Sequence, residues 1–147
     1  YYTGEADWSV IRHIVEAVDI PVIANGDVVD VASARAIREQ TGAAGVMVGR
    51  GCLGQPWLFA ALLADFRGEA VPTAPTLEER AQVMMDHATL ACHYKGERIA
   101  MQEMRKQIGW YVKGLPHAAA LRRESSQLNT LDDLKMLLAR EGYLQVD

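Results

Sequence analysis

Apolar residues near the start of the chain recur at helical spacing and then gather into two short runs. Spacing of this kind predicts a helix over residues 8–18. The apolar runs at 22–24 and 45–48 are typical of short buried strands. A helix that begins after Asp30 and ends before Gly42 is expected between them, and another helix is expected over 57–66. This order of elements predicts two parallel strands joined by a right-handed crossover.

The pattern changes after residue 66. Residues 67–75 are rich in proline and small or charged residues, show no periodicity and are expected to be a linker. Thr76 and Glu79 then form a capping-box pattern, and helical spacing continues to the end of the chain. Four helices are expected there, with Pro116 in the first turn of the third and Thr130 as the cap of the fourth. The positions expected to face inward are Leu77, Ala81, Met84, Ala88 and Ala91, then Met101, Met104, Ile108 and Val112, then Leu131, Leu134, Leu137 and Leu138.

These patterns predict an α/β region over residues 1–66, a linker over 67–75 and an all-α bundle over 76–147. A sheet of two parallel strands is too small to be stable alone. We therefore expect the α/β region to pair with further strands, either from a preceding part of a longer protein or from a second copy of the chain.

Glycine and a polar residue follow each predicted strand directly. The first strand runs into Asn25-Gly26-Asp27 and the second into Gly49-Arg50-Gly51. Backbone N–H groups that converge where no Cβ intrudes can bind an anion, and arginine adds a positive fork. In (β/α)8 barrels, the loops after the last two strands commonly hold a phosphate. The two turns therefore predict a phosphate site, although the same glycines could simply form tight turns.

Positive charge is concentrated in residues 95–123, although the whole chain has a net charge of −4. This segment holds seven Lys or Arg residues against two Glu residues. On one continuous helix, Arg98, Arg105, Lys106 and Lys113 would share a face distinct from the apolar stripe, with Trp110 beside them. A positive face edged by an aromatic residue suits a phosphodiester backbone and an unstacked base. On composition alone, an ordinary solvated helix face is as well supported as a face that binds nucleic acid.

Other chemistry finds little support in the sequence. Cys52 and Cys92 are isolated, without a spacing that suggests zinc or a disulfide, so we expect a reducing compartment and a cytoplasmic protein. No apolar run approaches the roughly 18 residues of a membrane span. We expect His87, His93 and His117 to be surface or packing residues. Cys52 has no base near it in the sequence, so the sequence does not indicate that it is a nucleophile.

Four motifs occur in order along the chain: Asp7-Trp8, residues 21–27, residues 45–51 with Gly54-Gln-Pro-Trp57, and Arg105-Lys106 with Gly109-Trp-Tyr-Val-Lys-Gly-Leu-Pro116. Together they resemble the tRNA-dihydrouridine synthases, and the bacterial B-type enzymes most closely. The barrel motifs are shared with other flavin enzymes, whereas their combination with the last motif is more specific. The resemblance covers essentially the whole chain.

The resemblance implies the last two β/α units of an FMN-binding (β/α)8 TIM barrel, followed by a helical tRNA-binding domain. Such enzymes reduce the C5–C6 double bond of particular uridines in tRNA, with NADPH as the reductant of FMN. By this resemblance Asn25, Gly26 and Asp27 match one FMN-binding loop, and Gly49 and Arg50 match the loop for the FMN phosphate. The basic pair of the tRNA-facing helix matches Arg105 and Lys106, and Arg98 and Lys113 extend the same face.

The match begins near the seventh barrel strand. The family's proton-donating cysteine and its flavin-ring lysine would belong to the preceding part, and neither Cys52 nor Cys92 matches the catalytic position. We therefore expect no catalytic residue in this chain and no synthase activity from it alone. Gln107 stands where the family often has histidine.

Two other functions stay open at this point. A barrel enzyme for a phosphorylated metabolite, such as an isomerase or aldolase, would use the same glycine turns. A stand-alone RNA-binding module would use the basic helix and keep the α/β region as a structural part.

Overall fold

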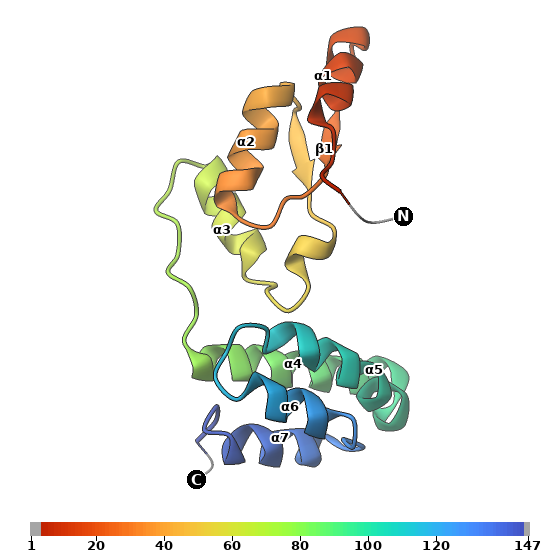
Figure 1. Cartoon of the computed structure of the whole chain (residues 1–147), viewed down its shortest axis with the longest axis vertical. Helices are drawn as coiled ribbons and strands as arrows, with labels where there is room; N and C mark the ends of the chain where they lie inside the picture. Colours follow the sequence, from red (N-terminus) through yellow and green to blue (C-terminus); the bar gives the residue numbers. More distant parts are fainter. Residues whose placement is uncertain (1–3, 146–147) are drawn as a thin grey trace. The chain divides into compact units, whose positions relative to one another are not determined.

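The computed structural model describes residues 4–145 of the chain (Figure 1). The chain divides into two compact units, with the boundary between Pro72 and Thr73. This boundary lies within residues 67–75, which form neither helix nor strand. No helix in the described part of the chain is long and apolar enough to cross a membrane.

Short strands and helices alternate in the first unit. Its elements are α1 (Trp8–Ala17), β1 (Ile23–Asn25), α2 (Val31–Thr41), β2 (Gly45–Met47), the 3-10 turn η1 (Arg50–Cys52) and α3 (Leu58–Phe66). The strands pair in parallel, with Ala24 opposite Val46, which confirms the predicted pairing. The first strand and the last helix begin one residue later than the sequence pattern indicates.

Helix α2 packs against both strands and lies between α1 and α3. Its Ala34 and Ile37 are fully buried. Ile23 and Met47 are each 58% exposed, so apolar side chains of the two-stranded sheet meet solvent. Ile14 and Val18, two of the apolar residues at helical spacing over 8–18, are also exposed in this unit.

The ends of α2 follow the sequence signals. Asp30 and Ser33 form a capping box at its start, and Gly42 closes its end with a φ of 72°, a left-handed conformation that suits glycine. Arg35 of α2 donates through Nε to both carboxylate oxygens of Asp65 in α3, at 2.9 Å each. This hydrogen-bonded guanidinium lowers the pKa of the Asp65 carboxyl.

The second unit consists of helices. They are α4 (Leu77–Lys95), α5 (Glu97–Tyr111), α6 (Ala118–Ser125) and α7 (Leu131–Arg140). The pairs α4–α5, α5–α6, α6–α7 and α4–α7 all pack together, so each helix has two neighbours (Figure 1). Capping boxes start α4 at Thr76 and α7 at Thr130.

Most positions predicted to face inward in this unit are buried. The fully buried side chains include Met84, Met101, Met104, Ile108, Val112, Leu121, Leu134 and Leu138. The prediction that Leu77 faces inward is wrong, because Leu77 is the first residue of α4 and remains exposed. The prediction that Pro116 lies in the first turn of the third helix is also wrong, because α6 begins at Ala118. His117, which precedes it, has a left-handed backbone with a φ of 57°. The Pro116 carbonyl instead accepts a hydrogen bond from the Tyr143 hydroxyl.

A half-buried histidine links the two longest helices. The Nδ1 atom of His87 on α4 is 3.1 Å from the hydroxyl of Tyr111 on α5, and the two share a hydrogen bond. Burial, together with the positive charge of Lys95, lowers the pKa of His87. The folded state therefore favours neutral His87.

This pKa shift predicts a pH dependence of stability. The unfolded chain binds a proton at His87 near the ordinary pKa of about 6.5, whereas the folded chain resists it. The stability that neutral His87 contributes should therefore be fully present above a pH of about 6.5, and the free energy of unfolding should fall as the pH drops below that value. In chemical denaturation at each pH, His87→Gln should show a smaller fall. His93→Gln, at an exposed position of the same helix, should keep the full fall. If the free energy of unfolding falls equally with pH in the two variants, His87 is not the group responsible.

Candidate functional site: two strand-end turns and a basic helix

The two strands of the first unit end side by side. The register pairs Asn25 with Met47, so the turns that follow β1 and β2 leave the same edge of the sheet. Arg50 Nη2 lies 3.9 Å from Asp27 Oδ1. A Cβ built on Gly49 would have the Asn25 amide nitrogen, at 4.0 Å, as its nearest neighbour. The structure thus brings together residues from both predicted turns.

The N-terminal segment shapes the first turn. Trp8 Nε1 donates to the Gly26 carbonyl at 3.2 Å, and the Ala6 N–H donates to Asp27 Oδ2 at 2.6 Å. A Cβ on Gly26 would lie only 2.6 Å from the Ala6 Cβ. We expected Gly26 to leave room for a ligand, but in the structure it leaves room for Ala6 and Trp8. Trp8, of the Asp7-Trp8 motif, therefore has a structural role in forming this turn.

The second turn packs directly on the first. A Cβ on Gly51 would lie 2.0 Å from the Val28 carbonyl oxygen, so only glycine permits this approach. Gln55 Nε2 donates to the carbonyls of both Val29 and Gly51, at 3.1 and 2.6 Å, and so links the two turns. Sequence reasoning assigned Gln55 no role, although it is part of the Gly54-Gln-Pro-Trp57 motif.

The space beside Gly49 is less crowded than that beside Gly26 and Gly51, because a Cβ there would meet only the Asn25 amide nitrogen, at 4.0 Å. The side chains of Asn25 and Arg50 beside it are exposed, and they offer an amide donor and a guanidinium. An anion in this space would meet both donors, while the Asp27 carboxylate would oppose it. The Arg50–Asp27 pair is long and exposed, so it adds little stability.

The two cysteines have different surroundings. Cys52 Sγ lies 3.2 Å from the Gly49 carbonyl, which accepts its hydrogen bond, so Cys52 supports the second turn. Burial, together with the Glu97 carboxylate, raises the pKa of the Cys92 thiol. Within residues 4–145, no group of three or more His, Cys, Asp or Glu side chains could hold a metal ion.

The second unit presents part of the predicted basic face. Arg98 and Lys106 lie on α5 and are exposed. Lys113 is exposed too, but the prediction of one continuous helix was wrong there, because α5 ends at Tyr111 with Val112 as its C-cap. Trp110, beside these cations in the sequence, is 39% exposed.

Arg105 behaves differently from the other three cations. It is half-buried, and its Nε donates to the Leu128 carbonyl at 3.0 Å. Its Nη2 donates to Asn129 Oδ1 at 2.9 Å. Arg105 therefore fastens the turn between α6 and α7 to α5, a role that its spacing in the sequence does not reveal.

Comparison with known proteins agrees with the motifs. The family model for dihydrouridine synthase (Dus) matches residues 1–145. A probable tRNA-dihydrouridine synthase of Mycobacterium tuberculosis strain H37Rv is 46% identical over 140 residues, which is 95% of this chain and 36% of the relative. Proteins of the same description from Mycobacterium leprae and Rickettsia bellii are 44% and 41% identical, over 95% and 88% of this chain and 36% and 40% of their own lengths.

The chain belongs to the dihydrouridine synthase family. This confirms the family resemblance inferred from the four motifs. The chain spans somewhat more than a third of the length of these curated relatives, at 36% to 40%. Within this chain, the strand-end turns and α5 contain the residues that the resemblance singled out.

The contacts of Arg105 predict a structural effect of its removal. Arg105→Gln should leave the Leu128 carbonyl without its guanidinium partner and lower the free energy of unfolding by about 1–2 kcal/mol. Chemical denaturation measures this. Lys106→Gln, at the exposed neighbouring position, should stay within about 0.5 kcal/mol of the parent chain. If the two variants unfold at the same denaturant concentration, Arg105 has no such role.

Proposed function

We propose that this chain forms the C-terminal part of a flavin-dependent tRNA-dihydrouridine synthase. In this proposal the first unit supplies the last two β/α units of an FMN-binding (β/α)8 barrel, and residues 76–147 form a helical tRNA-binding domain. The complete enzyme would act in the cytoplasm and reduce the C5–C6 double bond of specific uridines in tRNA, with NADPH as reductant. The observation that carries the proposal is the meeting of two strand-end turns beside Gly49 in a member of this family.

The first unit has features that suit a piece of a larger barrel. Ile23 and Met47 are each 58% exposed, and only two strands make up the sheet among the described residues. Exposed apolar side chains and unpaired strand edges favour further strands alongside. Strands from the rest of the barrel would cover them, and a second copy of this chain is the other candidate.

The donors at the strand ends suit a phosphate group. The Asn25 amide and the Arg50 guanidinium would hold the phosphate of FMN, with Gly49 leaving the space. Gly26 and Asp27 would act by setting the shape of the first turn, because Trp8 and Ala6 bind them. FMN, when bound, supplies the hydride for the uracil ring. We assign no catalytic residue to this chain, and we expect it to be inactive alone.

The helical unit has the charge that a tRNA backbone requires. Arg98, Lys106 and Lys113 are exposed and can approach phosphates. Arg105 contributes charge from a half-buried position and holds the α6–α7 turn in place. These four residues form the proposed tRNA-binding set.

The phosphate site can be tested on the chain itself. In two-dimensional NMR of the 15N-labelled chain, added inorganic phosphate or FMN should shift the amide signals of Gly26, Asp27, Gly49 and Arg50. Arg50→Gln should weaken this binding by about tenfold, because a charged hydrogen-bond donor to the phosphate is lost.

Arg67→Gln is the matched control, because Arg67 is an exposed arginine at the end of α3 in the same unit. It should leave the phosphate titration unchanged. Shifts that spread over the whole chain, or equal weakening by both variants, would count against a site at the strand ends.

The RNA interface can be tested by binding of unmodified tRNA. Lys106→Gln should weaken the affinity and reduce the slope of log K against log salt concentration by about 1, because one phosphate contact is lost. Fluorescence anisotropy with labelled tRNA at several salt concentrations measures both quantities.

Lys135 provides the comparison, since it is an exposed lysine of the same unit but lies on α7. Lys135→Gln should change neither the affinity nor the salt slope. If Lys106→Gln behaves like Lys135→Gln, the α5 face is not the interface.

A further inference from the structure

Two neighbouring arginines of α6, Arg122 and Arg123, have different surroundings. The side chain of Arg122 lies over Gly109 of α5, where a Cβ would be 3.9 Å from both Cγ and Cδ of the arginine. The apolar stem of Arg122 thus crosses the surface of α5 where that helix has no side chain. Long charged side chains commonly bury their stems in this way and keep the charged end in water.

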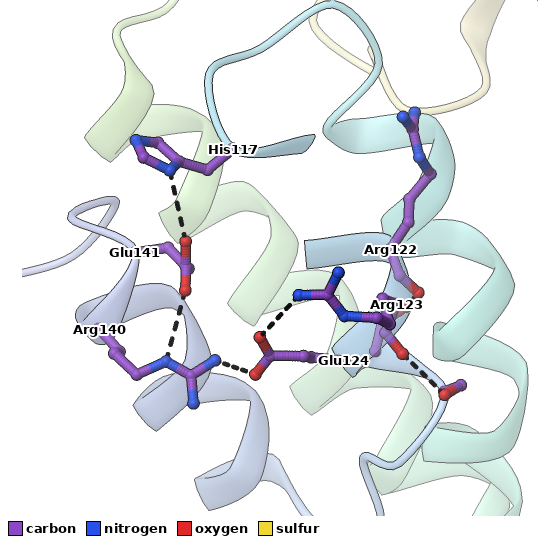
Figure 2. A network of polar contacts seen from close by, with 8 residues as sticks. His117, Arg122, Arg123, Glu124, Arg140 and Glu141 are labelled. Atoms are coloured by element: carbon purple, nitrogen blue, oxygen red, sulfur yellow. Dashed lines mark hydrogen bonds and ion pairs between the residues drawn. The ribbon is translucent and has the colours of Figure 1, made fainter. Parts of the chain in front are cut away.

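Arg123 faces a cluster of compensating charges instead. Its Nη2 lies 3.9 Å from Glu124, and Glu124 also pairs with Arg140 of α7. Arg140 Nε lies 3.3 Å from Glu141, whose carboxylate is 3.7 Å from His117. Figure 2 shows this network and the Arg122 side chain extending away from it.

The position of Arg122 places its charge on the basic side of α5. Gly109 is three residues after Lys106, so the two lie one turn apart on neighbouring positions of the helix surface. At about 100° per residue, Gly109 falls between Arg98 and Lys106 around the helix. Within residues 4–145 the Arg122 guanidinium forms no ion pair, and the residue is exposed. Its charge therefore adds to those of Arg98 and Lys106, whereas Arg123 lies in a network with Glu124, Arg140 and Glu141.

We propose that Arg122, positioned by Gly109, is a further phosphate-contacting residue of the tRNA-binding surface, and that Arg123 is not. This inference rests on the proposed tRNA-binding function of the helical unit. It enlarges the predicted set by a residue from a second helix, so the surface spans α5 and α6.

The matched variants Arg122→Met and Arg123→Met test the proposal in the 147-residue chain. Methionine keeps an unbranched apolar stem over Gly109 and removes only the charge. Binding of labelled, unmodified tRNA is measured by anisotropy across a series of salt concentrations. Arg122→Met should weaken binding by about tenfold and reduce the salt slope by about 1. Arg123→Met should leave both near the parent values, and Arg122→Lys should restore the slope.

The outcomes separate this inference from the proposed function. If the parent chain binds tRNA and loses affinity with Lys106→Gln, but Arg122→Met and Arg123→Met give the same affinity and slope, the role of Arg122 is overturned and the tRNA interface stands. If the parent chain does not bind tRNA, both fall. A thermal melt of each variant by circular dichroism accompanies the titration. If Arg122→Met has a lower melting temperature than the parent chain, the salt slope of tRNA binding by Arg122→Lys is used instead. A slope like that of the parent supports the phosphate contact, and a slope reduced by about 1 overturns it.

Discussion

The close approach of Gly51 to the Val28 carbonyl is the constraint on which the first unit's site depends. No side chain fits between them, since a Cβ would come within 2.0 Å of that oxygen. The approach allows the turn after β2 to lie against the turn after β1, and Gln55 then bonds to carbonyls on both. Because the two turns are held in contact, the Asn25 amide and the space at Gly49 lie close together.

In the second unit, a side chain rather than a close backbone approach holds two parts of the chain together. Arg105 binds the Leu128 carbonyl and the Asn129 amide, and thereby joins the α6–α7 turn to α5. Asn129 in turn donates its N–H to Asp133, in the capping box that starts α7. A basic residue can therefore belong to a positive helix face and still act mainly inside the protein. The charges available to a partner are those whose donors are not already used.

Local patterns in the sequence predicted most of the elements, because caps and stops act over a few residues. Asp30, Gly42, Thr76 and Thr130 were all assigned correctly as helix boundaries. The pattern failed where the chain leaves regular structure: at Lys113, which lies beyond the end of α5, and before α6, where His117 rather than Pro116 sets the start. It also could not show the bonds of Arg105 to Leu128 or of Gln55 to Val29, because these partners lie 23 and 26 residues away in the chain.

The three glycines at the strand ends show why a motif alone does not locate a ligand. Gly26, Gly49 and Gly51 look alike in the sequence, and each was expected to expose backbone to an anion. In the structure, Gly26 makes room for Ala6 and Trp8, and Gly51 makes room for Val28, so both serve packing within the protein. Gly49 is the least crowded of the three, because a Cβ there would meet only the Asn25 amide nitrogen, at 4.0 Å. Gly26 and Gly51 shape the turns around the space at Gly49. A substitution at either would therefore disturb a bound phosphate indirectly, through the shape of the turns.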